Sequence, residues 1–281
     1  MSRAAAALRP GLARGLIELR QAFAGPALIG QLFWPAATLA AIFFLRHKAL
    51  GGTRFDLGTL VLPGVLGMYT ALGMVLMIQY LTAEREDGTL LRAKTVPNGI
   101  RGYFLGKLVT VSGSIGAYLA MLTIPGLLLV GGLDLGRART WLTLAWVLPL
   151  GLVATQSIGA AVGSVISGPR AAGYIALLVT GLIAISGIFY PITSMPRWLQ
   201  GTAQVFPVYW LGLGVRSALL PASAASVEIG HSWRQLATLG VLGAWGAAGL
   251  VAAPLVLRRM ARRESGSSLA RRREKAVAQA R

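Results

Sequence analysis

Long stretches without any charged side chain dominate this chain. A helix needs roughly 20 apolar residues to cross about 30 Å of hydrocarbon, and a single charge at mid-bilayer costs about 2.5–3.5 kcal/mol on insertion scales. Six uncharged stretches of sufficient length predict six transmembrane helices in an all-α integral membrane protein, with a membrane domain over residues 26–257. The stretches that contain no Asp, Glu, Lys or Arg are 21–45, 57–83, 108–133, 140–169, 171–196 and 235–257.

Composition agrees with this pattern and indicates an orientation. Only 13% of the residues are charged, against about 25% in a typical soluble domain. The net charge of +18 would suggest a nucleic-acid partner in a soluble protein, but basic residues in a membrane protein mark cytoplasmic loops. With both termini placed inside, the inside segments hold nineteen basic residues and the outside segments eight. We therefore expect cytoplasmic termini and no nucleic-acid partner. Arg greatly outnumbers Lys in an Ala- and Gly-rich chain, which favours a bacterial protein of the inner (plasma) membrane.

The two ends of the chain differ from the membrane domain. Residues 1–25 carry spaced arginines and lack the pattern of a signal peptide, and their apolar residues recur at helical spacing. This predicts an amphipathic helix in the membrane interface, which either contacts a partner or only anchors the first span. Residues 258–281 are predicted to form a disordered, basic cytosolic tail near anionic membrane lipids rather than a specific binding motif. The apolar positions of the N-terminal helix are Leu12, Leu16, Leu19 and Phe23.

The segment from Tyr190 to Arg234 is the longest one predicted outside, and it is not plainly polar. Prolines interrupt it and apolar side chains recur between them. This favours short re-entrant or interfacial helices between spans 5 and 6 over a plain surface loop. Its aromatic residues Trp198, Tyr209 and Trp210 are expected at the level of the lipid headgroups.

Small residues at four-residue spacing mark faces where helix backbones approach closely. The two patterns fit packing within the chain as well as dimerisation. They are Gly159, Gly163 and Ser167 in span 4, and Ser112, Gly116 and Ala120 in span 3.

No group of residues indicates catalysis, a bound metal or a bound cofactor. The chain has no cysteine, which excludes disulfides and thiolate metal sites, and His47 and His231 are isolated from other metal ligands. Gly106-Lys107 is not a phosphate-binding loop, because Arg101 stands where that motif needs glycine. The spans also lack the ionisable residues that ion-driven carriers bury. We expect no enzymatic activity here and an outside source of energy for any transport.

The polar segment from Glu84 to Lys107 is the strongest indication of function. It separates the second and third apolar stretches and holds three of the nine acidic residues within four positions. Gly88 breaks the preceding helix, Thr89 fits the N-cap of a short helix, and Pro97 ends it.

Such a helix would lie across the cytosolic membrane surface, with Leu90, Leu91 and Ala93 available to dock a soluble partner. The alternative is that the charges only solvate a loop and fix its topology. Acidic residues contribute little to orientation, so docking is the favoured interpretation.

The ordered set of motifs resembles the permeases of type 2 ATP-binding-cassette (ABC) exporters. Glu84-Arg85-Glu86-Asp87-Gly88-Thr89-Leu90, followed by Pro97 and Gly106-Lys107, resembles that family's cytosolic loop, and Gly187-Ile188-Phe189-Tyr190-Pro191 resembles the end of its fifth span. The resemblance implies a half-transporter that pairs with a second copy or a related permease, and with two copies of a separate ABC ATPase that bind ATP and Mg. The coupling residues that it implies are Glu84, Glu86, Asp87, Gly88, Thr89, Leu90 and Pro97.

The mechanism implied by the resemblance is alternating access, in which ATPase closure moves the coupling helix between spans 2 and 3. The N-terminal helix would contribute to the same junction, and substrate would pass along spans 1, 2 and 5. Ala93 and Val96 depart from the family pattern. The apolar spans favour a hydrophobic drug or lipid-like substrate. A second interpretation is a membrane scaffold or sensor that recruits a soluble partner without transport, and a third is a self-contained carrier or membrane enzyme.

Overall fold

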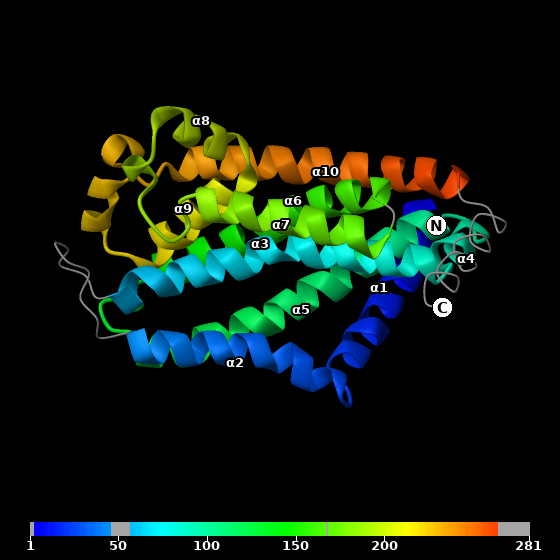
Figure 1. The fold of residues 1–281 in the computed structure, drawn as a ribbon, viewed down its shortest axis with the longest axis horizontal. Helices are drawn as coiled ribbons and strands as arrows, with labels where there is room; N and C mark the ends of the chain where they lie inside the picture. The colour runs from blue at the N-terminus through cyan, green and yellow to red at the C-terminus, as the bar shows by residue number, and fades with distance from the viewer. Residues whose placement is uncertain (1–2, 46–56, 167, 264–281) are drawn as a thin grey trace.

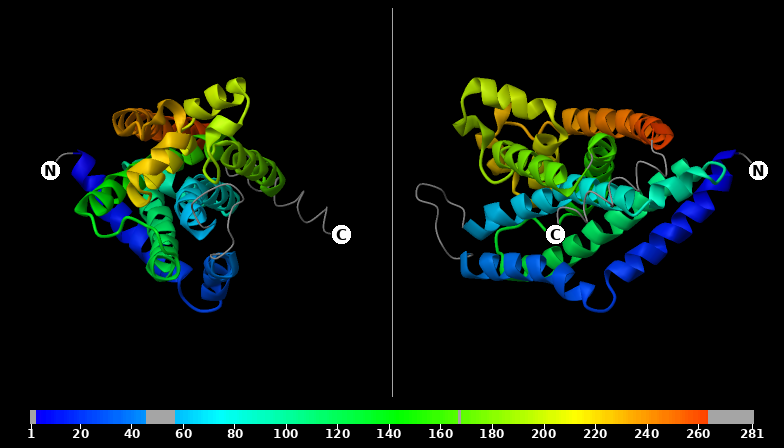
Figure 2. Two further views of the ribbon diagram at one scale, coloured as in Figure 1. Left: turned by 90° about the vertical axis from the view of Figure 1, so that its left-hand side faces the viewer. Right: turned by 45° about the vertical axis from the view of Figure 1, so that its right-hand side comes forward.

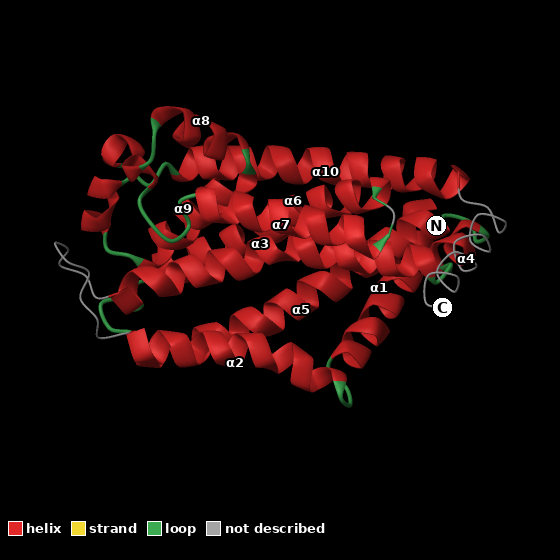
Figure 3. Ribbon diagram, viewed as in Figure 1, coloured by secondary structure: helices red, strands yellow, loops and turns green. Residues whose placement is uncertain are grey.

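The computed structural model describes residues 3–45, 57–166 and 168–263. All regular structure in these residues is helical (Figure 3), which confirms the all-α fold. His47 and the predicted tail beyond 263 lie outside the described residues. The α-helices are α1 (Arg3–Ala22), α2 (Ala27–Leu45), α3 (Leu57–Glu86), α4 (Thr89–Lys94), α5 (Gly99–Leu129), α6 (Ala138–Val165), α7 (Pro169–Ile185), α8 (Arg197–Val205), α9 (Pro207–Leu219) and α10 (Gln235–Arg263). Short 3-10 helices are η1 (Ile192–Ser194), η2 (Ala222–Val227) and η3 (Ile229–His231).

Four of the described helices are long and apolar enough to cross a membrane. These are α3, α5, α6 and α10, and each contains one of the predicted apolar stretches or most of it. α2 and α7 are apolar but shorter. α5 begins at Gly99, well before the uncharged stretch that starts at 108. α10 continues through Arg263, so the last helix includes the first part of the predicted tail.

α3 lies at the centre of the bundle. It packs against α5, α6, α7 and α9, while α6 packs in turn against α10. In Figure 1, α4, the start of α1 and the end of α10 lie at one end of the molecule, and α8 and α9 lie at the opposite end. α2 and α7 flank the bundle on its outside (Figure 2). The polar segment between α3 and α5 is therefore gathered at one end of the long helices.

Two glycines allow α6 to approach α3 closely. A Cβ atom on Gly159 would lie 2.5 Å from the backbone oxygen of Met74, and one on Gly163 would lie 3.1 Å from the Cα of Ile78. Close backbone contact is the usual role of small residues at this spacing in membrane helices. The structure therefore assigns Gly159 and Gly163 to packing within the chain, whereas Ser167 of the same pattern lies outside the described residues. A Cβ on Gly116, from the other pattern, would meet open space.

Every residue of α9 is buried. Tyr209 and Trp210 are among them, so these two rings pack inside the protein and are not presented to lipid headgroups. The indole nitrogen of Trp210 donates to the backbone oxygen of Gln204 at 2.7 Å, which provides the polar partner that a buried tryptophan needs. Trp198 in α8 is exposed, as a residue at headgroup level would be.

Arg216, expected in an outside loop, is buried in an ion pair. Its Nε donates to Oε1 of Glu228 at 2.8 Å, and its Nη1 donates to the backbone oxygen of Gly187 at 2.8 Å. Removing one partner of a buried pair leaves an uncompensated charge and costs about 3–5 kcal/mol. The pair therefore holds α9 against both the end of α7 and the segment that leads into α10.

Gly159→Ala should push α6 away from α3, because the new Cβ meets a backbone oxygen that cannot rotate away. We expect a loss of about 1–3 kcal/mol, measured as a lower thermal unfolding midpoint of the detergent-solubilised protein. Gly116→Ala is the matched control, since nothing lies within 4 Å of its new Cβ, and it should be neutral or slightly stabilising. Equal midpoints for the two variants would contradict the close contact.

Candidate functional site

The polar segment after α3 folds into the short helix α4. Gly88 adopts a φ of 76°, a left-handed conformation that glycine adopts without steric cost. The prediction that Gly88 interrupts the helix is confirmed. Gly88 rather than Thr89 occupies the N-cap position, and Thr89 is the first helical residue. The helix ends at Lys94, before Pro97.

α4 turns apolar side chains toward the bundle. Leu90 and Ala93 are buried, because α4 packs against α3 and α5. The structure therefore does not offer these two residues as a docking surface; they anchor α4 to the membrane domain. The exposed residues around α4 are Asp87, Arg92, Lys94, Thr95, Val96 and Pro97.

Glu84 points into the protein, although it belongs to the predicted docking segment. Its carboxylate forms an ion pair with Lys107 of α5, and the two side chains are 16% and 1% exposed. The Nζ of Lys107 also lies 4.8 Å from the centre of the Tyr80 ring, a distance that favours a cation–π interaction. Glu84 and Lys107 thus connect α3 to α5 near the segment that carries α4.

α1 completes this group of charges. Oε2 of Glu18 accepts hydrogen bonds from Nζ of Lys107 at 2.5 Å and from Oγ1 of Thr110 at 3.1 Å. Arg14 pairs with Glu18 at 2.7 Å and with Glu84 at 3.5 Å. We refer to Arg14, Glu18, Glu84 and Lys107 as the charge cluster. Its two cations and two carboxylates balance, and they tie α1, α3 and α5 together.

The pKa shifts in α1 agree with ionised partners. Burial acts to raise the pKa of Glu18, but hydrogen bonds from Lys107 and Arg14 outweigh it and lower that pKa. Burial acts to lower the pKa of Arg14, yet the hydrogen bond and charge of Glu18 and the charge of Glu84 raise it. Each shift favours the charged form, so the folded protein stabilises the cluster as ions.

Glycines bring the backbones of α1 and α5 into contact. A Cβ on Gly11 would lie 2.7 Å from the backbone oxygen of Gly102, and one on Gly15 would lie 2.6 Å from that of Gly106. Any larger residue at these positions of α1 would force the two helices apart. The close approach is what places Glu18 within reach of Lys107.

This contact was not predicted from the leucine spacing of the N-terminal segment. Leu12 and Leu16 are exposed, whereas Leu19 lies against Gly113 of α5 and Phe23 lies beside Tyr118 of the same helix. The glycine face of α1 packs against α5 as well. Two signals in the sequence indicate the contact: glycines repeat at four-residue spacing on both helices, and Lys107 stands alone at the edge of an apolar stretch. Neither signal shows which helix is contacted, because the two helices come together only in the folded structure.

The bundle of long apolar helices defines a multi-pass membrane protein. The chain belongs to the ABC-2 family of transporter proteins, since residues 53–253 match the family model described as "ABC-2 family transporter protein". This confirms the resemblance to ABC-2 type permeases. No curated protein matches the chain. The matched region includes α4, Glu84 and Lys107, whereas α1, with Arg14 and Glu18, precedes it.

Lys107→Met should destabilise the junction, because two carboxylates lose the cation that they share. Breaking a buried pair costs about 3–5 kcal/mol, and the 21% exposure of Glu18 favours the lower end of that range. The thermal unfolding midpoint and the protease sensitivity of α1 would measure the effect. Lys94→Met makes the same change at an exposed position of α4, and it should change neither the unfolding midpoint nor the protease sensitivity of α1. Matching midpoints for both variants would show that the charge cluster adds no stability.

The attachment of α1 should also depend on pH. The pKa of Glu18 is lowered from 4.5. The stabilisation that its carboxylate gives to the attachment of α1 is therefore fully present above that value and is lost as pH falls through the lower pKa of the folded protein. Spin labels on Leu16→Cys and Gln79→Cys, specific in a chain without cysteine, should keep one separation at neutral pH and show a longer one in strong acid. Glu18→Gln should weaken this transition, and an unchanged transition in that variant would assign it to another group.

Proposed function

We propose that this chain is the transmembrane permease subunit of an ATP-driven ABC exporter, powered by separate ATPase subunits. Membership of the family supports a membrane transport subunit. The observation that carries the proposal is the attachment of α4, which is anchored on α3 and α5, while the charge cluster ties both helices to α1. A force on α4 would therefore move long helices as a unit, and α3 alone, with 30 residues, extends about 45 Å.

In this proposal, the end that carries α4 faces the bacterial cytoplasm, and six helices span the inner membrane. α2 and α7 supply the two spans beyond the four long helices, because their 19 and 17 residues correspond to about 28 and 26 Å. These lengths approach the roughly 30 Å of hydrocarbon. α1 would lie in the cytoplasmic interface with its exposed leucines toward lipid, and α8 and α9 would form the short helices of the outer side.

The proposed coupling residues take different positions, and two of them, Gly88 and Thr89, form the start of α4. Asp87 and Pro97 are exposed and would contact the ATPase directly, with Glu86 half-buried beside them. Leu90 would hold α4 on the bundle. Glu84 would not contact the ATPase. Its ion pairs with Arg14 and Lys107 would transmit a movement of α4 to α1 and α5.

The outer faces of α2 and α7 support pairing with a second copy or a related permease. Both helices flank the bundle (Figure 2) and expose large apolar side chains. In the proposed dimer these faces meet along the substrate path, which alternates between inward- and outward-facing states. A change between the two states requires a ligand that binds one of them more tightly. In this proposal the ATP-bound ATPase is that ligand. The exposed side chains are Phe33 and Trp34 on α2, and Tyr174, Leu177 and Leu178 on α7.

The substrate proposed for this path is a hydrophobic drug or a lipid-like compound. α2 contains no charged residue, and α7 contains only Arg170 near its start. A sugar or an ion would need polar groups along the path to replace its water. The aliphatic and aromatic faces of α2 and α7 offer an apolar solute a favourable surface instead.

The double variant Glu86→Lys with Asp87→Lys should abolish recovery of the ATPase and export, while membrane insertion and the unfolding midpoint stay unchanged. Both side chains lie outside the charge cluster, so the reversal leaves the ion pairs of that cluster in place. Asp134→Lys reverses one charge in the α5–α6 loop at the other end of the bundle. It removes only an ion pair with the exposed Arg137, so it serves as the control and should keep both activities. Wild-type export by the double variant would refute a docking role for this surface.

The first measurement is a pull-down of the tagged, detergent-solubilised protein from its host, with ATPase activity assayed on the eluate. A stoichiometric soluble subunit with nucleotide-dependent activity would support the proposal. A homo-oligomer without ATPase activity, under conditions that preserve known transporter complexes, would support the scaffold or sensor instead.

A further inference from the structure

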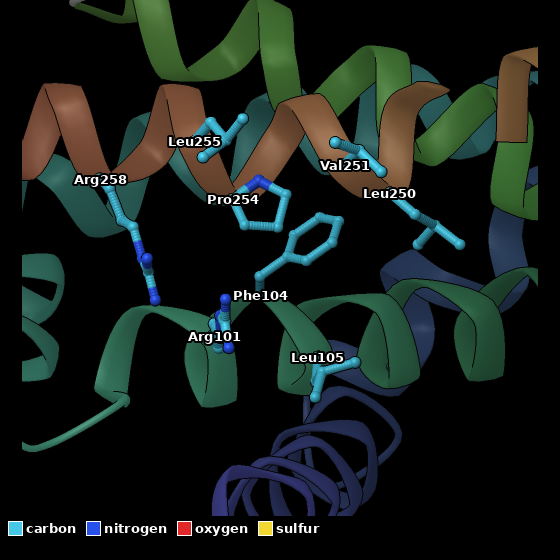
Figure 4. A pocket seen from close by; sticks show the side chains of 8 residues that line it. All are labelled: Arg101, Phe104, Leu105, Leu250, Val251, Pro254, Leu255 and Arg258. Atoms are coloured by element: carbon cyan, nitrogen blue, oxygen red, sulfur yellow. The ribbon is translucent and has the colours of Figure 1, made fainter. Parts of the chain in front are cut away.

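A pocket of about 410 Å³ lies between α5 and α10 near the end of the bundle that carries α4 (Figure 4). Its inner wall is apolar and includes Phe104 of α5, which is buried, and Pro254 of α10. On the outer side, Val251 and Leu255 are 66% and 52% exposed. In a membrane protein, side chains on such an outward face meet lipid acyl chains. The pocket is therefore open toward the bilayer along α10.

Two arginines lie at one end of this pocket. Arg101 of α5 and Arg258 of α10 extend toward the space between the two helices (Figure 4). Within the described part of the chain, neither guanidinium forms a hydrogen bond or an ion pair, and no acidic residue lines the pocket. Two cations that converge without a carboxylate repel one another, so the arrangement favours an anion between them.

The position of the arginines along their helices indicates where that anion comes from. Arg258 directly follows the uncharged stretch 235–257, and Arg101 lies in the first turn of α5. Arg258 therefore stands at the boundary between the apolar part of α10 and the aqueous side, and Arg101 lies on the aqueous side of the uncharged stretch of α5 that starts at 108. Lipid phosphates occupy this level of a bilayer, and basic pockets between transmembrane helices on the cytoplasmic side bind lipid headgroups.

We infer that the pocket binds an anionic phospholipid of the cytoplasmic leaflet. Arg101 and Arg258 would hold the headgroup phosphate, for which the guanidinium fork offers paired N–H donors. One acyl chain would lie along Phe104, Pro254 and Leu255. An acidic peptide would satisfy the arginines but leave the apolar wall against water, so a lipid fits both halves of the site.

This assignment rests on the cytoplasmic orientation in the proposed function, and it has a mechanical consequence. α10 packs chiefly against α6, and the pocket is where its end faces α5. A phospholipid held by both arginines would join α10 to the helix that carries Lys107. Lipid composition would then influence the same group of helices that α4 moves.

Native mass spectrometry of the detergent-solubilised permease, without its ATPase, tests the inference. The probe is phosphatidylglycerol, with phosphatidylcholine as the zwitterionic comparison. The wild-type protein should retain phosphatidylglycerol preferentially, and Arg101→Gln with Arg258→Gln should weaken its binding about 10-fold or more. Arg259→Gln is the matched control, because it removes the neighbouring charge of α10 from an exposed position that does not line the pocket.

Three outcomes would overturn the inference. They are equal retention of the two lipids by the wild-type protein, an equal loss of binding in the Arg259→Gln control, and displacement of the lipid by millimolar glycerol phosphate as effectively as by phosphatidylglycerol. The last outcome would assign the arginines to a free phosphate rather than a lipid. Each single arginine variant should keep the wild-type unfolding midpoint and lose part of the binding. Because no ATPase is present, a negative result here leaves the proposed transport function standing.

Discussion

The junction of this protein depends on a lysine that has no access to water. Lys107 is 1% exposed, and a buried ammonium without partners would cost several kcal/mol. Its carboxylate partners come from two other helices, Glu18 of α1 and Glu84 of α3. α1, α3 and α5 must therefore stay together for the charge to be satisfied, and Arg14 neutralises the second carboxylate. A segment that precedes the membrane domain becomes part of it in this way.

The same constraint separates two roles within one acidic segment. Glu84 belongs to the interior of the protein, whereas Asp87 is exposed on the surface that α4 presents. Gly88 turns the chain between α3 and α4, so one side of α4 is exposed while its buried side holds the long helices. For a family of transport proteins, this arrangement joins a soluble surface to the membrane helices through ion pairs and packed side chains.

Much of the helical fold follows from the uncharged stretches alone, because a charged residue at the centre of a transmembrane helix makes its insertion unfavourable. The errors arise where charges or aromatic rings find partners that are distant in sequence. α5 begins before its uncharged stretch and carries Lys107, whose charge is paired with Glu18 and Glu84. Tyr209 and Trp210 are buried because α9 packs inside the bundle. In the candidate site, the break at Gly88 is predictable from glycine chemistry, whereas the partners of Glu84 depend on tertiary packing.

The glycines between α1 and α5 have a further consequence for how the two helices are aligned. Gly11 and Gly15 on one helix, and Gly102 and Gly106 on the other, repeat with the same four-residue period. The observed register has two such glycine pairs, and a register shifted by one turn would keep a single pair and set the other glycine of α1 against Asn98 or Thr110. Only the observed register brings Glu18 to Lys107. Backbone shape and electrostatics therefore favour the same register, so a slip of α1 along α5 would lose a close glycine contact and the ion pair with Lys107 together.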